Sequence, residues 1–278
     1  MPKKKPSYRY SAQLLKKHWD RLHQGDREPW PEESLIARMG ARHAPFASRL
    51  ESLGGPAAVA LALQRAWEEF HAGDFRAAIE QGSKLGAIGA AVANKAAAVD
   101  SLYSKQHEPI ILQELDTGVK RGELAVKLLP DYANLHYTLA LVLGRYSQRI
   151  TILRALAEGL AGRVHAHLQR AVALEPRHAE AHVALGLYHA EIINKLGALA
   201  ASLAYGASRD KAIEHFQHAV KFAPLSPIVH MEYANGLRLL DAPRYRAQIN
   251  TLYEQAAACK PVDAMEQLDS DRARQSVT

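Results

Sequence analysis

The sequence predicts an all-α protein, folded as a right-handed superhelical solenoid of about five antiparallel helix hairpins. Alanine and leucine dominate, and alternating runs of Val, Ile and Thr are scarce, so helical propensity prevails in most windows. Each of four prolines closes a helical segment with a similar set of spaced small and bulky residues: Pro130, Pro176, Pro224 and Pro261. Stacked hairpins of this kind usually hold other molecules rather than transform them.

Composition sets limits on the class of protein. The chain has 278 residues, 48% apolar and 23% charged, enough for a core in one elongated domain or two compact ones. Cys259 is the only cysteine, so no disulfide can form within the chain. No apolar run approaches 20 residues and no signal-like apolar stretch follows the N-terminal charges, so we expect a cytoplasmic protein that is not transmembrane; a mitochondrial presequence is the weaker option.

The formal net charge of +6 is concentrated at the N-terminus. Six basic residues precede the first acidic residue, Asp20: Lys3, Lys4, Lys5, Arg9, Lys16 and Lys17. The other 29 Lys and Arg residues balance 29 Asp and Glu residues, so we expect no specific nucleic-acid partner. The arm at 1–17 has two interpretations, a weak contact with an anionic surface or an ordinary solvated terminus.

A helical extension is expected before the repeats. Short helices are predicted from Ala12 to His23 and from Glu32 to Arg38, with a turn through Gly25 and the run 29–31 between them. Proline followed by two acids suits the second helix start. The run Gly54–Gly55–Pro56 is the clearest boundary. The expected organisation is an arm at 1–17, an extension at 18–53, repeats at 54–261 and a tail at 262–278.

The first two hairpins are predicted from turn chemistry. Gly73 suits a left-handed cap, Asp74 can cap the following helix, and Phe75 can wedge between the pair. The second hairpin is expected at 87–104 and 109–129.

The later hairpins share one pattern in their second helices. Gaps of four, three and five residues separate the matched positions, which keeps one stripe pointing inward. The three sets are Val164, Leu168 and Ala171 before Pro176; Ala212, Phe216 and Ala219 before Pro224; and Ile249, Tyr253 and Ala256 before Pro261. A bulky residue beside a small one recurs in the first helices, at Leu139–Ala140, Leu185–Gly186 and Tyr233–Ala234.

This pattern resembles the tetratricopeptide repeat (TPR) family over roughly Pro56 to Pro261. Gly73–Asp74–Phe75 with Ala78 resembles the central turn of that repeat. The positions that match its two helices are Leu185, Gly186, Ala212, Phe216, Ala219 and Pro224. The resemblance implies a noncatalytic scaffold for protein or peptide partners, with first helices lining a concave groove.

The spacing of the prolines departs from that family. They lie 46, 48 and 37 residues apart, against about 34 in an ordinary repeat. The extra residues, at 144–162 and 189–208, have helical composition, so we expect lengthened helices; one from Ala133 to about Glu158 would span ~39 Å. Such hairpins resemble those of the helical accessory subunit of TRAP transporters and of regulator-of-microtubule-dynamics proteins. An alternative function follows, a ligand-holding accessory protein with a cavity between elongated helices.

Candidate partner-binding residues lie on the stripe of the first helices expected to be exposed. Arg145 and Arg238 could pair with a carboxylate, and the asparagines could bond to an extended backbone. A solvated helix face is the alternative. The candidates are Asn134, Tyr137, Arg145, Glu191, Asn194, Asn235 and Arg238.

Metal and catalytic sites are not expected. Two histidine pairs, His178 with His182 and His215 with His218, have spacings that could place two ligands on a helix face. No third ligand follows at motif spacing, so surface histidines are favoured. The glycines at 82, 86 and 89 lack the strand and the Lys-Ser/Thr pair of a phosphate loop, so helix packing is favoured. No nucleophile motif is present, and no cofactor is expected. A homo-oligomer stays open.

Overall fold

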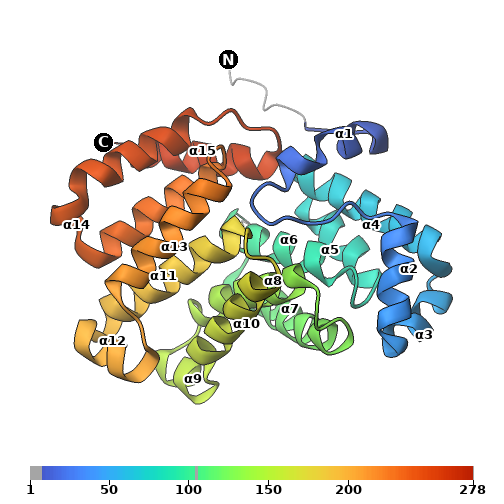
Figure 1. Ribbon diagram of the computed structural model, residues 1–278, viewed down its shortest axis with the longest axis horizontal. Helices are drawn as coiled ribbons and strands as arrows, with labels where there is room; N and C mark the ends of the chain where they lie inside the picture. The colour runs from blue at the N-terminus through green and yellow to red at the C-terminus, as the bar shows by residue number, and fades with distance from the viewer. Residues whose placement is uncertain (1–7, 104–105, 278) are drawn as a thin grey trace. The chain divides into compact units, whose positions relative to one another are not determined.

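The computed structural model describes residues 8–103 and 106–277, and within these ranges the chain forms fifteen α-helices and no strand (Figure 1). The all-α prediction is confirmed for this part of the chain. The chain divides into two compact units. The first comprises the described residues up to Trp19 together with Glu28–Leu174, and the second comprises Asp20–Arg27 and the residues from Glu175 onward.

The first unit contains three helix pairs and the N-terminal extension. In chain order, its helices are α1 (Ala12–Leu22, to Trp19), α2 (Glu33–Arg42), α3 (Ala44–Ser52), α4 (Gly55–Ala72), α5 (Phe75–Lys84), α6 (Ala90–Tyr103), α7 (Glu108–Leu128), α8 (Ala133–Ser147), α9 (Ile152–Ala157) and α10 (Leu160–Leu174). The pairs are α4 with α5, α6 with α7, and α8 with α10. The first helices of these pairs, α4, α6 and α8, pack in succession, and α2 and α3 pack on α4.

The second unit contains two more pairs and a C-terminal helix. Its helices are α11 (Ala179–Leu196), α12 (Ala198–Tyr205), α13 (Arg209–Phe222), α14 (Pro227–Ala258) and α15 (Ala264–Ser276). Helix α11 packs on α13 and α14, and α15 packs on α14.

Helix α14 is itself a hairpin. Its backbone leaves the helical region at Asp241 (φ −176°, ψ 87°), two residues before Pro243. A proline cannot donate the helical hydrogen bond, and Asp241 starts the second half by accepting from the backbone of Arg244 at 3.2 Å. The two halves meet where the Tyr253 hydroxyl donates to Asn235 Oδ1 at 2.6 Å. The predicted fifth hairpin is therefore present.

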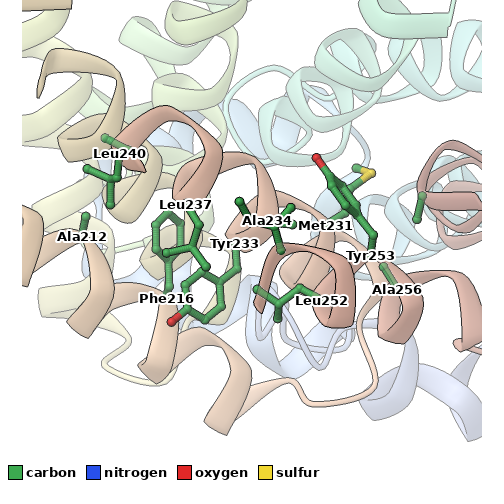
Figure 2. Close-up of a cluster of buried hydrophobic side chains, with 13 residues drawn as sticks. Ala212, Phe216, Met231, Tyr233, Ala234, Leu237, Leu240, Leu252, Tyr253 and Ala256 are labelled. Carbon is green, nitrogen blue, oxygen red and sulfur yellow. The ribbon is translucent and has the colours of Figure 1, made fainter. Parts of the chain in front are cut away.

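The repeated stripe points inward, as predicted. Its members are buried in all three second helices, except for the half-buried Val164. Phe216 lies against two glycines of neighbouring helices. A Cβ atom built on Gly186 would lie 2.5 Å from the Phe216 ring, and one on Gly236 would lie 2.2 Å from it. Tyr233 stacks on the same ring at 4.8 Å (Figure 2). The small residues thus let two neighbouring helices, α11 and α14, approach the ring of Phe216 on α13.

The predicted continuous helix from Ala133 to about Glu158 is wrong. Helix α8 ends at Ser147 and α11 ends at Leu196, and the extra residues beyond these ends form the separate short helices α9 and α12. Thr151 starts α9 by accepting from the backbone of Arg154. Gly197 separates α11 from α12 with a φ of 78°, a value that favours glycine. Leucines of the inserted helices are exposed, and Leu199 and Leu203 of α12 are 76% and 81% accessible.

The first hairpin turn follows its predicted chemistry. Gly73 adopts a left-handed conformation with φ 87°, Asp74 accepts from the backbone of Ala77 at 3.1 Å, and Phe75 is buried. Gly82 and Gly89 allow a close backbone approach, because a Cβ on Gly89 would meet the Gly82 carbonyl at 2.0 Å. Helix packing therefore accounts for these two glycines.

In the described ranges, we find no helix whose length and apolar character would let it cross a bilayer.

Candidate partner-binding surface

The structure places two candidate residues in the interior. Asn134 and Tyr137 of α8 are 3% and 5% exposed. The prediction that they lie on an exposed stripe is wrong. Asn134 is covered because Glu28, from a distant loop of the same unit, bonds to it, and helical spacing along α8 cannot reveal such a contact.

A buried carboxylate occupies the space beside Asn134. Glu28, from the loop between α1 and α2, accepts a 2.6 Å hydrogen bond from Asn134 Nδ2 and another from the Tyr132 hydroxyl. The backbone carbonyl of Glu28 accepts from the Trp19 indole at 2.7 Å. Since these contacts pair a buried charge with donors, the N-terminal extension is anchored on α8 within the first unit.

Trp19 lies within an aromatic cluster of the same unit. Its ring makes edge-on contacts with Trp30 at 4.9 Å and with Trp67 of α4 at 6.0 Å. This cluster further anchors the extension to the first helix of the first hairpin.

Arg145, near the end of α8, differs in burial from Asn134 and Tyr137. It is half-buried, and Nη1 donates to the Gln148 amide at 3.3 Å. Its Nε has no hydrogen-bond partner among the described residues. No carboxylate of the described chain forms an ion pair with it, so its charge is not neutralised locally.

The candidates of the second unit differ in exposure. Asn194 and Arg238 are exposed, whereas Glu191 and Asn235 are half-buried. Glu191 pairs with Lys195 at 3.5 Å. Asn235 bridges two side chains of α14, donating to Glu232 at 2.9 Å and accepting from Tyr253. These contacts give Asn235 a structural role where the two halves of α14 meet.

Arg238 lies at the rim of a shallow, open pocket of about 380 Å³ at the kink of α14. Its lining residues are Arg238, Ala242, Pro243, Arg246, Ile249 and Asn250. Arg238 forms no ion pair or hydrogen bond with another described side chain. Two exposed guanidinium groups therefore border a depression formed where the helix bends back.

The loop before α2 also contributes to the second unit. Its Gly25 carbonyl accepts from the backbone of Glu180 at the start of α11, at 2.9 Å. A Cβ atom on Gly25 would meet the Glu180 carboxylate at 2.6 Å, so the Glu180 side chain would have to shift to accept any other residue here. Arg21 forms a two-pronged ion pair with Glu266 of α15, at 2.6 and 3.0 Å. Burial raises the pKa of Glu266, and this ion pair opposes the rise.

A histidine recurs six residues after three of the repeat prolines. The ring Nε2 of His136, His182 and His230 lies 3.0, 3.1 and 2.8 Å from the carbonyls of Pro130, Pro176 and Pro224. Each histidine thus ties the first helix of a hairpin to the turn before it. These contacts were not predicted from the sequence, although the constant spacing from proline to histidine was a signal that could have indicated them.

Two of these histidines also pair across their hairpins. Nδ1 of His136 lies 3.0 Å from Nδ1 of His167, and Nδ1 of His182 lies 2.9 Å from Nδ1 of His215. Burial lowers the pKa of His136 and lowers that of His167 to about 4, so this pair is neutral near pH 7.

The preference for surface histidines is wrong for the pair 178 and 182. His178 is fully buried and caps α11 by accepting from the backbone of Ala181 at 3.1 Å, and His182 is 7% exposed. These rings satisfy backbone groups at the hairpin turns. Their burial could not be read from spacing alone because it depends on how separate helices pack around each turn.

No protein-family model matches the sequence, and no curated protein matches it. Solved structures, by contrast, align with the chain. A thermophilic TPR protein of Thermus thermophilus aligns with a TM-score of 0.55 at 16% identity, covering 78% of this chain and 99% of that one. Human IFIT1, solved as a dimer with PPP-AAAA, aligns with a TM-score of 0.41 at 18% identity, covering 92% of this chain and 60% of that one. The first likeness shows that the chain has a TPR-like fold.

Proposed function

We propose that this protein is a noncatalytic, TPR-like interaction scaffold that binds a protein or peptide segment in a groove lined by the first helices of its hairpins. The fold supports this class, because helical repeats present extended surfaces to other chains. The observation that carries the proposal is the state of Arg145 and Arg238. Arg145 belongs to the first unit and Arg238 to the second, and neither is paired with a carboxylate of the described chain.

The chemistry of these residues indicates the kind of partner. Guanidinium groups bind carboxylates through two parallel hydrogen bonds, so the segment carries acidic side chains or a terminal carboxylate. The exposed Asn194 supplies an amide for its backbone. We assign Asn134 and Tyr137 to the support of the fold rather than to direct contact with the partner, since both are buried and Asn134 donates to Glu28. We also propose a cytoplasmic location, which a single, half-buried Cys259 fits.

The test compares two double charge reversals. Arg145→Glu with Arg238→Glu changes the proposed surface, while Lys127→Glu with Lys221→Glu reverses two exposed charges on second helices. Proteins captured from native lysate by the wild type and the lysine variant, and lost from the arginine variant, support the groove. Melting temperatures of both variants should match that of the wild type. Equal capture by a folded arginine variant would show that these residues do not bind the partner.

Two other interpretations are less well supported. The ligand-cavity interpretation depends on elongated first helices, but α8 and α11 end before the inserted helices. Tethering through the basic arm rests mainly on Lys3, Lys4 and Lys5, which lie outside the described residues.

A further inference from the structure

Three histidines of the second unit meet at one point. His182 comes from α11, and His215 and His218 come from α13. One ring nitrogen from each lies within 4.8 Å of the other two. His182 is buried, and the other two are half-buried, so the cluster is partly accessible to solvent.

His182 is held in the form that a metal requires. Its Nε2 faces the Pro176 carbonyl at 3.1 Å, which places the ring proton on Nε2 and leaves a lone pair on Nδ1. Imidazoles that bind metals in proteins usually donate their other N–H to a carbonyl or carboxylate in this way. Burial and the neighbouring His218 also lower the pKa of His182.

The lone pair of His182 points at a second nitrogen. Nδ1 of His215 lies 2.9 Å away, and in the metal-free state it donates its proton to His182. Two imidazoles on one tetrahedral zinc ion, with bonds of about 2.1 Å, place their nitrogens about 3.4 Å apart. A small opening of the pair, with the proton of His215 moved to its other nitrogen, would admit the ion.

The third hairpin supplies an internal comparison. It has the same pair, His136 and His167, and the same contact from the first histidine to a proline carbonyl. Three residues after His167, however, stands Arg170 rather than a histidine. Its charge acts on His136 and lowers the pKa of that ring, as Arg163 does for His167. The histidine pair is therefore a feature of hairpin packing, and a cation is disfavoured there.

The fourth hairpin differs at two positions beside this pair. His218 replaces the arginine, and Glu214 stands where the third hairpin has Ala166. The Glu214 carboxylate acts electrostatically on His182 and favours positive charge there. In the fifth hairpin, Leu252 takes the place of His215, so no pair forms.

We propose that His182, His215 and His218 bind a divalent transition-metal ion of the zinc class, with a fourth position left open to water or an outside ligand. Imidazole nitrogen suits Zn²⁺, Cu²⁺ and Ni²⁺ and does not suit Mg²⁺ or Ca²⁺. None of the three histidines is a candidate groove residue, so this site stands or fails independently of the scaffold function.

The test uses the full chain without an affinity tag. Titration with Co²⁺ should produce the visible absorption bands of a cobalt ion with nitrogen ligands, at one ion per chain, and Zn²⁺ should displace it. His218→Arg, which copies the third hairpin, should weaken Zn²⁺ binding at least tenfold. His167→Gln, the matched control in the third hairpin, should leave binding unchanged.

Folding is checked separately by circular dichroism and melting. His218→Asn serves as a second variant, since it is close in size to histidine and adds no charge. Absence of the cobalt bands in the wild type, or undiminished Zn²⁺ binding by either folded His218 variant, would overturn the proposal. Loss of binding in His167→Gln would also overturn it, because it would place the ion on another set of histidines.

Discussion

Asn134 donates its side-chain amide to Glu28 across 2.6 Å and thereby joins the third hairpin to the N-terminal extension within the first unit. A residue that helical spacing offers to a partner is instead engaged by the chain itself. The extension is therefore part of the folded body. Asn134 is therefore not available to a partner at the start of α8.

Replacing Glu28 by alanine should lower the free energy of unfolding by about 2–4 kcal/mol, because the buried amide of Asn134 and the half-buried hydroxyl of Tyr132 lose an acceptor. Urea denaturation monitored by circular dichroism measures the change. Glu51→Ala, at an exposed position of α3, is the control and should change stability by less than about 0.5 kcal/mol. Equal effects of the two substitutions would show that the Glu28 contacts are not stabilising.

Gly236→Ala should destabilise the protein by about 1–3 kcal/mol, because the new methyl group would overlap the Phe216 ring. Adding Phe216→Leu to this variant should recover part of the loss, since leucine leaves room for the methyl. Thermal melting of the single and double variants measures both effects. A Cβ atom built on Gly144 in α8 would meet no other atom within 4 Å. Gly144→Ala should therefore stabilise the helix by up to about 1 kcal/mol.

Stability should fall on acidification through the His136–His167 pair. The pKa of His167 is about 4 in the folded protein, below its ordinary value of 6.5, so the unfolded chain binds more protons between these values. The stability that the neutral His167 ring contributes is fully present above pH 6.5 and is lost as the pH falls toward 4. After allowance for partial exposure, the loss between pH 7 and pH 5 is about 1 kcal/mol. In His167→Gln, the difference in unfolding free energy between these two pH values should shrink by that amount; an unchanged difference would contradict the shift.

The inserted helix α12 should tolerate charge on its exposed face. Leu199→Glu with Leu203→Glu should change the free energy of unfolding by less than about 0.5 kcal/mol, because both side chains already contact solvent. Leu252→Ala, in the buried core of the fifth hairpin, is the contrast and should cost about 2–5 kcal/mol. A large loss in the α12 variant, measured by denaturant unfolding, would show that these leucines are packed in solution.

The repeat pattern was predictable because it is local. Small and bulky residues at gaps of four and three lie on one face of a helix, so the sequence determined that Ala212, Phe216 and Ala219 point inward. Glycine and aspartate at 73 and 74 likewise determined the first turn, since left-handed backbone and helix capping depend on single residues.

What lies against each face was decided only by the tertiary structure. Spacing along α8 could not show that Glu28, more than one hundred positions away, covers Asn134. Nor could it bring His182 to His215 and His218, which lie on a different helix. Hydrophobic periodicity orients a helix about its own axis, but the partners of a side chain depend on how separate helices stack, and that choice is made by the sum of many contacts between distant residues.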